Sequence, residues 1–236
     1  MNPQPIRKAA LAAVILASGC GAPAGATDAK HPTVVELFQS QGCSSCPPAI
    51  ANLNSLADRP DILALTFAVT YWDQLGWKDT FAKPEFTDRE RAYAQAGTSA
   101  FATPQAVING RRTVNGGDRD QLVAAIRQAD RGETGPEIVA GPNRLTIGKG
   151  AAERPATVWL VRYDRRTLSV PIRAGENGGR ILAHRNVVRA LVVLGTWRGS
   201  PVALALPMDH DPNLRSAILV QSGPGGPIIA ATRPAT

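Results

Sequence analysis

The sequence contains few of the residues on which most catalytic and metal sites depend. Its 236 residues include three cysteines, three histidines and two methionines, and aromatic residues make up only 5% of the chain. It has no Ser-His-Asp signature, phosphate-binding glycine loop, HExxH motif or internal repeat. These absences exclude the familiar hydrolase, nucleotide-binding and zinc-protease patterns, and they leave the cysteines as the main candidates for chemistry.

Long apolar runs are also scarce, and the clearest one lies close to the N-terminus. Arg7 and Lys8 precede an apolar stretch over residues 9–17, which is too short to span a bilayer. Small residues at 24–26 then offer a cleavage site, so residues 1–26 are predicted to form a secretory signal peptide. We therefore expect a periplasmic or secreted protein with no transmembrane span in its mature form.

A second interpretation of this segment makes Cys20 the lipidated first residue of a bacterial lipoprotein. The signal would then end before Cys20, and the cysteine would carry a lipid anchor. Ala17 stands where such sites usually carry leucine, which argues against this interpretation. Both interpretations export the protein to a compartment in which disulfides persist. Cleavage after Ala26 would leave Cys43 and Cys46 as the only cysteines of the mature chain.

Acidic residues are in modest deficit, with 19 Asp and Glu against 26 Lys and Arg and a formal net charge of +7. Basic residues gather at 162–166 and 180–189. Because the chain is predicted to leave the cytoplasm, we interpret these clusters as solvated surface and expect no nucleic-acid partner.

The most informative motif is Cys-Ser-Ser-Cys at residues 43–46. An apolar, β-branched run over 33–38 predicts a buried strand before it, and Pro47 and Pro48 favour a first helical turn after it. Cys43 is therefore expected at the N-terminus of a helix, where free N–H groups stabilise a thiolate. This makes Cys43 the expected nucleophile and Cys46 the resolving thiol; a static disulfide is the alternative.

Glu36 is a further candidate beside the motif, because it lies in the strand that otherwise appears buried. A desolvated carboxylate near a dithiol can relay protons during thiol exchange. The alternative is a carboxylate that faces solvent or pairs with an arginine or lysine. The sequence leaves the two interpretations open.

Eight of the twelve aromatic residues lie between Phe67 and Phe101. The nearly continuous apolar run over 62–69 predicts a central parallel strand, and the aromatic connection that follows contains Trp72 and Trp77. These tryptophans either pack a core or line a substrate groove above the dithiol. A capping box at 87–90 then predicts a short helix from about residue 88 to 96.

Thr103 and Pro104 form the second informative spot. A proline can adopt the cis form at little cost, and Pro104 opens a strand at 105–108 that ends in the hairpin dipeptide Asn109-Gly110. A returning strand and a helix capped by Asp118 follow. The predicted order is strand, helix, strand, helix, strand, strand, helix, which is the order of thioredoxin.

Several short runs carry a resemblance that goes beyond fold class. They are VELF (35–38), GCSSCPP (42–48), YWD (71–73), GWKD (76–79), TPQ (103–105), GENGGR (175–180) and HRNVVR (184–189). These runs resemble the secreted thioredoxin-like family catalogued as domain of unknown function 1223. The resemblance implies a thioredoxin-like fold, with Cys43 and Cys46 as the redox pair and Pro104 as the cis-proline facing them. It does not bring an established substrate. We expect no cofactor and assign no metal ligand.

The second half of the chain has a different sequence pattern. From about residue 136, Gly and Pro separate short runs in which apolar and polar residues alternate. The runs are residues 144–147, 157–163, 168–173, 187–194, 202–206 and 217–221. This spacing predicts an all-β, sandwich-like domain. We therefore expect an α/β thioredoxin-like domain at 31–132 and a β-sandwich-like domain at 137–236, with residues 175–180 as a loop that projects toward the dithiol or remains a surface turn.

The function that these observations favour is an exported thiol-disulfide oxidoreductase acting on protein thiols or disulfides of the cell envelope. Thr103, Trp72 and Trp77 are then candidates for binding the partner chain. One alternative is a non-catalytic binding module with a structural disulfide. The other is copper or zinc handling, in which His184 would complete a soft Cys2His set, although the sequence does not place His184 near the cysteines.

Overall fold

The computed structural model describes Met1 and residues 31–129, 135–208 and 211–234. Apart from Met1, the predicted signal peptide lies outside the described residues, and so does Cys20. Both interpretations of that segment therefore stay predictions. The elements of the first half are β1 (Thr33–Gln39), α1 (Cys46–Asn54), β2 (Ile62–Ala68), the 3-10 helix η1 (Asp73–Leu75), α2 (Pro84–Gln95), β3 (Gln105–Ile108), β4 (Arg112–Asn115) and α3 (Arg119–Gln128). This is the order of strands and helices predicted from the sequence.

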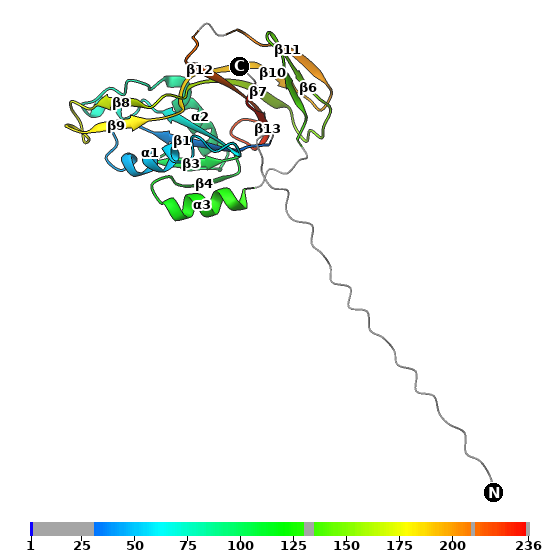
Figure 1. Cartoon of the computed structure of the whole chain (residues 1–236), viewed down its shortest axis with the longest axis horizontal. Coiled ribbons are helices and arrows are strands. Elements are labelled where there is room, and N and C mark those ends of the chain that lie inside the picture. The colour runs from blue at the N-terminus through cyan, green and yellow to red at the C-terminus, as the bar shows by residue number, and fades with distance from the viewer. Residues whose placement is uncertain (2–30, 130–134, 209–210, 235–236) are drawn as a thin grey trace.

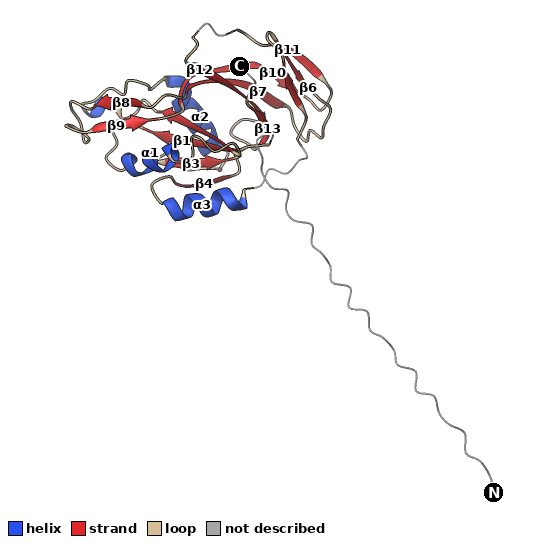
Figure 2. Ribbon diagram, in the orientation of Figure 1, coloured by secondary structure: helices blue, strands red, loops and turns tan. Residues whose placement is uncertain are grey.

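The second half contains strands without a further helix among the described residues. They are β5 (Ile138–Ala140), β6 (Arg144–Ile147), β7 (Ala156–Asp164), β8 (Leu168–Pro171), β9 (Ile181–His184), β10 (Val187–Trp197), β11 (Val202–Ala205), β12 (Leu214–Ser222) and β13 (Ile228–Thr232). Figure 2 shows the helices gathered around one part of the molecule, whereas the part that contains β6 and β11 consists of strands and loops.

A large mixed sheet organises the described part of the chain. Its eight strands run in the order β13-β12-β7-β10-β2-β1-β3-β4. Within it, β1 pairs parallel with β2 and antiparallel with β3. Strands β11, β6 and β5 form a smaller antiparallel sheet, and β8 and β9 form a hairpin. In Figure 1 this hairpin lies beside α1, at the end of the molecule away from β6 and β11.

The local predictions around the second informative spot are confirmed. The Thr103–Pro104 peptide bond is cis. Asn109 and Gly110 have φ angles of 49° and 60°, as a tight hairpin between β3 and β4 requires. The Asp118 side chain accepts a hydrogen bond from the Gln121 N–H at 2.9 Å and so caps α3.

Helix α2 begins earlier than predicted, at Pro84 instead of about residue 88. Proline is favoured in the first turn of a helix because it has no N–H to leave unpaired. Thr87 lies inside the helix, and its hydroxyl accepts a hydrogen bond from the Thr70 N–H at 2.9 Å. The threonine therefore ties the helix to the segment after β2, and it does not cap the helix.

The strands of the second half do not form the separate sandwich that the sequence predicts. Strands β7, β10, β12 and β13 extend the sheet of the first half, since Val187 of β10 pairs parallel with Thr66 of β2. Thr66 N–H donates to the Asn186 carbonyl at 3.0 Å, and Asn186 Nδ2 donates to the Ala64 carbonyl at 2.9 Å. All seven residues of β2 are buried, so its second edge needs a partner, and β10 supplies one.

A sandwich-like layer does exist locally, where the β5-β6-β11 sheet packs on the extended part of the large sheet. The shared core contains Leu145 from β6, Trp197 from β10 and Ile218 from β12. The two-layer packing predicted for the second half is thus present on one face, while the hydrogen-bonded sheet continues into the first half.

Alternation along β1 decides which side chains can reach the cysteines. Val35 and Leu37 lie on the face covered by α1 and α3, in the same core as Cys43 and Cys46. Val34 and Phe38 lie on the opposite face, which α2 covers. Because successive side chains of a strand point to opposite faces, a residue of even number in β1 points away from the dithiol.

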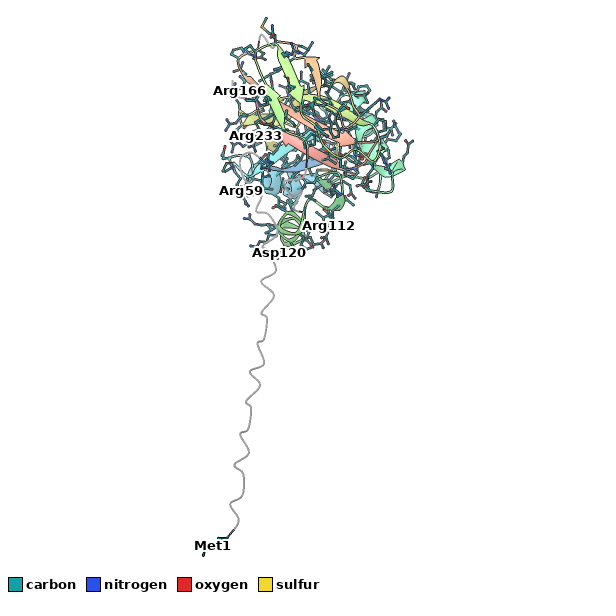
Figure 3. All side chains as sticks on the ribbon, turned by 90° about the vertical axis from the view of Figure 1, so that its right-hand side faces the viewer. Met1, Arg59, Arg112, Asp120, Arg166 and Arg233 are labelled. Carbon is teal, nitrogen blue, oxygen red and sulfur yellow. A yellow bond between two sulfur atoms is a disulfide. The ribbon has the colours of Figure 1, made fainter. Side chains whose placement is uncertain are left out.

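Positive charge is distributed over the surface. Figure 3 places Arg59, Arg112 and Arg166 on the outside of the molecule at well-separated points. Within the residues that the structure describes, no helix is long and apolar enough to cross a membrane.

Candidate functional site

Cys43 and Cys46 form a disulfide at the N-terminus of α1. Cys46 is the first residue of the helix, and its N–H donates to the Cys43 carbonyl at 3.1 Å. Cys43 Sγ lies 3.2 Å from Ser45 Oγ. Ser44 and Ser45 are exposed, whereas both cysteines have an exposed fraction of 0%. The motif therefore presents its two serines to solvent and keeps its sulfur atoms covered.

Part of that cover comes from residues 69–83, called here the connecting segment. Trp77 Nε1 donates to Gln41 Oε1 at 3.0 Å, and Trp72 Nε1 donates to Thr103 Oγ1 at 2.8 Å. Both tryptophans are half-buried and pack against the core that contains the cysteines. The structure thus brings Trp72, Trp77 and Thr103 to the region of the dithiol, where they serve packing and hydrogen bonding.

Pro104 lies at the same edge of the sheet as the segment that leads to the cysteines. Gln105 pairs with Phe38 near the end of β1, which places Pro104 beside the start of the turn to Cys43. The Pro104 carbonyl accepts a hydrogen bond from the Gly116 N–H at 3.2 Å. The cis-proline therefore lies at the end of β1 from which the chain turns to Cys43.

The rest of the cover comes from residues 173–180, called here the capping loop. Asn177 has an exposed fraction of 0%, and its Nδ2 donates to the carbonyls of Gln41 and Cys43 at 2.9 and 2.8 Å. Glu176 Oε2 accepts a hydrogen bond from the Ser44 N–H at 2.9 Å. Of the two interpretations of residues 175–180, a surface turn and a loop that projects toward the dithiol, these contacts fit the second.

The capping loop also contacts the connecting segment. Gly175 adopts a φ of 72°, and a Cβ built on it would lie 3.1 Å from Trp77 Cβ. A side chain at this position would therefore be both strained and crowded. The glycine lets the loop lie against Trp77, so that the two segments cover the disulfide together.

Asp79 holds the turn before the cysteines, a role that no local sequence pattern indicates. It is 3% exposed; Oδ2 accepts from the Gln41 N–H at 2.7 Å and Oδ1 from the Phe81 N–H at 2.8 Å. Burial raises the pKa of this carboxyl to about 6. An aspartate in an exposed-looking loop carries no sequence signal for this contact, because its partner lies 38 residues away.

Glu36 lies on the face of the sheet opposite the dithiol. Its Oε1 accepts from Arg89 Nε at 2.6 Å and its Oε2 from the Tyr93 hydroxyl at 2.5 Å, both on α2. The carboxylate is 0% exposed. Of the two interpretations left open by the sequence, this geometry fits pairing with an arginine, and it offers Cys43 no proton relay through Glu36.

His184 does not join the cysteines in a metal site. Among the described residues, no group of three or more His, Cys, Asp or Glu side chains is close enough to hold a metal ion. His184 instead packs edge-on against Phe81, with ring centroids 5.5 Å apart. It is 0% exposed, and neither ring nitrogen has a hydrogen-bond partner in the described part of the chain.

This burial predicts acid sensitivity. Desolvation lowers the pKa of His184 from 6.5 to about 4, so the unfolded chain binds a proton in this range that the folded chain does not. Above pH 6.5 both states hold a neutral histidine and His184 costs no stability. As the pH falls from 6.5 toward 4, protonation of the unfolded chain lowers the free energy of unfolding. We expect His184→Phe to reduce the loss of unfolding free energy between pH 7 and pH 4 by about 3 kcal/mol.

Urea unfolding of the wild type and the His184→Phe variant at both pH values measures this effect. Burial raises the pKa of Asp79 to about 6 and that of Glu90 to about 7, which changes stability in the opposite direction. Only the difference between the two proteins therefore reports on His184. An identical pH dependence in both would show that the histidine is protonated in the folded state.

Comparison with known proteins gives one family and two similar structures. Residues 34–221 match the family described as Protein of unknown function (DUF1223). The crystal structure of protein AGR_C_4864 from Agrobacterium tumefaciens is 32% identical, covers 85% of this chain and 92% of its own, and has a TM-score of 0.67. HBP35 of Porphyromonas gingivalis is 12% identical, covers 87% of this chain and 75% of its own, and has a TM-score of 0.54.

The two structures support different statements. The HBP35 likeness, at 12% identity, shows a shared fold alone. The likeness to AGR_C_4864 extends over most of both chains and agrees with the family match. No curated protein matches the chain. A family match that includes the dithiol, the connecting segment, the cis-proline and the capping loop shows that this chain belongs to the family described as Protein of unknown function (DUF1223).

Proposed function

We propose that this protein is an exported, thioredoxin-like thiol-disulfide oxidoreductase whose redox pair is Cys43 and Cys46. The observation that carries the proposal is the disulfide at the N-terminus of α1 beside the edge that holds the cis Thr103–Pro104 bond. A helix N-terminus stabilises a thiolate. The order of β1, α1, β2, α2, β3, β4 and α3 and the pairing β2-β1-β3-β4 support a thioredoxin-like unit.

The exchange proceeds in two balanced steps. A thiolate of a partner protein attacks Cys43 Sγ, which forms a mixed disulfide and releases Cys46 as a thiolate. A second thiolate of the partner then attacks the partner's sulfur atom in the mixed disulfide. This forms the partner's disulfide and releases Cys43 as a thiolate. The partner is oxidised to a disulfide, the Cys43–Cys46 pair takes up two electrons, and the same steps run backward oxidise the pair.

The proposed partners are protein thiols or disulfides of the cell envelope. The backbone beside Pro104 is the proposed site for the partner chain, which would lie there as an added strand. Thr103, next to Pro104, accepts a hydrogen bond from Trp72, and Trp77 donates to Gln41 in the turn that leads to Cys43. These three residues are the proposed contacts of the partner chain. The periplasmic or secreted location, and the alternative of a lipid anchor at Cys20, remain part of the proposal.

One observation favours a second candidate, a binding module in which the disulfide has only a structural role. Both cysteines are 0% exposed, and reactive cysteines are usually partly accessible. The oxidoreductase proposal therefore requires the capping loop to move before a partner thiolate reaches Cys43. Three hydrogen bonds from Glu176 and Asn177 hold the loop to residues 41–44. Asn177 is the one buried residue of the loop, and the others are exposed.

A trapping experiment tests the proposal. In a Cys46→Ser variant of the exported full-length protein, a mixed disulfide at Cys43 cannot be resolved, so we expect covalent adducts with envelope proteins. Non-reducing electrophoresis and mass spectrometry detect them. The Cys43→Ser/Cys46→Ser double variant is the control and should form none.

The redox potential of the wild-type pair completes the test. Absence of adducts together with a potential below about −300 mV would identify a structural disulfide and favour the binding module. Adducts that disappear in the double variant would support the oxidoreductase.

A further inference from the structure

The N-terminus of α1 receives its negative charge from a distant part of the chain. The helix has no acidic residue in its first turn, and its N-cap residue Ser45 makes no side-chain capping bond. Glu176, 132 residues beyond Ser44, supplies the missing carboxylate at this helix end, since its Oε2 accepts a hydrogen bond from the Ser44 N–H at 2.9 Å. This hydrogen bond lowers the pKa of Glu176, which keeps it ionised at neutral pH.

A Cys43 thiolate would use the same end of the same helix. The free N–H groups and the positive dipole end at residues 43–46 stabilise one anion, and a second anion beside it is repelled. In the disulfide the sulfur atoms are neutral, so Glu176 binds Ser44 without opposition. When the disulfide is reduced, the carboxylate and the thiolate compete.

We propose that Glu176 is a positioning residue that sets the ionisation of Cys43 and links the redox state of the dithiol to the capping loop. It holds the loop down over the disulfide and is displaced when Cys43 becomes a thiolate. The inference rests on the proposed function in one respect, which is that the disulfide undergoes reduction. Reduction by an external dithiol transfers two electrons and leaves Cys43 as a thiolate, Cys46 as a thiol and the reductant as a disulfide.

Other charges around Cys43 are placed differently. Helix α1 contributes none, because its sequence CPPAIANLN is uncharged. The connecting segment contains Lys78, Lys83, which donates to the Arg189 carbonyl, Asp79, which binds the Gln41 N–H, and Asp73, which accepts the Asp79 N–H at 3.0 Å. The capping loop contains Arg173 and Arg180, and Arg180 Nη1 donates to Asn177 Oδ1 at 3.1 Å. Glu176 is the charge in this group that bonds directly to the cysteine motif.

The variant Glu176→Gln isolates the charge, because a glutamine carbonyl can still accept the Ser44 N–H. We expect a lower pKa for the Cys43 thiol, by the absorbance of the thiolate during pH titration of the reduced protein. We also expect the equilibrium with reduced and oxidised glutathione at pH 7 to shift toward the dithiol by about threefold to tenfold. The direction follows because removing a neighbouring negative charge stabilises the thiolate.

Two comparisons keep the test specific. Glu153→Gln removes one carboxylate from the exposed loop before β7, whose first residue Ala156 belongs to a core cluster other than that of the cysteines, and should leave both quantities unchanged. The difference between wild type and Glu176→Gln should shrink at 1 M salt, since an exposed carboxylate is screened. An unchanged or higher pKa of Cys43 in Glu176→Gln, or an effect equal to that of Glu153→Gln, would overturn the inference.

The outcome is separate from that of the trapping experiment. A shift in the Cys43 pKa, with no envelope adducts and a potential below about −300 mV, would support the role of Glu176 while overturning the oxidoreductase proposal. Adducts without a shift would support the oxidoreductase and overturn the role of Glu176.

Discussion

Replacing Arg89 with methionine should lower the free energy of unfolding by about 3–5 kcal/mol, because it leaves a buried carboxylate without a counter-charge. The side chains of Arg89 and Glu36 are 3% and 0% exposed, and Arg89 Nε lies 2.6 Å from Glu36 Oε1. Arg89 also donates to Gln221 Oε1 and to the Tyr93 hydroxyl, both at 3.1 Å. A methionine of similar length fills the space but satisfies none of these groups.

The position is built for a guanidinium. Burial acts to lower the pKa of Arg89, but Glu36 and Tyr93 together outweigh it and raise the pKa above its usual range. The guanidinium also lies 5.3–5.7 Å from the ring centroids of Phe67, Tyr93 and Trp159. Three hydrogen-bonding directions and three aromatic neighbours fit a planar, permanently charged group.

Urea unfolding monitored by tryptophan fluorescence measures the change. Arg91→Met is the matched control, because Arg91 lies on the same helix and pairs with Asp88 at the surface, where such pairs contribute at most about 1 kcal/mol. A Glu36→Gln/Arg89→Met double variant should be more stable than Arg89→Met, since it removes the unpaired charge. If Arg89→Met is no worse than Arg91→Met, the buried pair makes no net contribution.

Replacing Asn177 with alanine is expected to accelerate reduction of the Cys43–Cys46 disulfide by about tenfold to a hundredfold. The change deprives the buried carbonyls of Gln41 and Cys43 of their donor, and each unsatisfied buried group costs roughly 1–3 kcal/mol. That cost applies to the closed capping loop and not to the open one, so it raises the open population. Because both sulfur atoms are covered, a reductant reaches them mainly through that population.

Timed reduction by dithiothreitol, followed by alkylation and mass spectrometry, gives the rate. Asn143→Ala is the control, since Asn143 is exposed and lies outside the capping loop, in the turn before β6. Unfolding in urea should be compared for the two variants to separate local opening from global instability. Equal reduction rates in the wild type and Asn177→Ala would show that the loop does not limit access to the disulfide.

The sequence by itself determined the features that depend on a few neighbouring residues. Two prolines after the Cys-Ser-Ser-Cys motif placed α1, Asn109-Gly110 placed the β3–β4 hairpin, and Asp118 placed the start of α3. The backbone preferences and capping bonds behind these predictions act over one to four residues. They are therefore readable without knowledge of the rest of the chain.

Only the tertiary structure decided what surrounds the dithiol and how the two halves join. The alternation of β1 turned Glu36 toward Arg89 on the far face, and the unpaired edge of β2 accepted β10, so that two expected domains share one sheet. Asn177 and Glu176 reach the motif from more than 130 residues away. Such contacts depend on sheet register and on which loop closes over which edge, and a local sequence pattern contains no information about either.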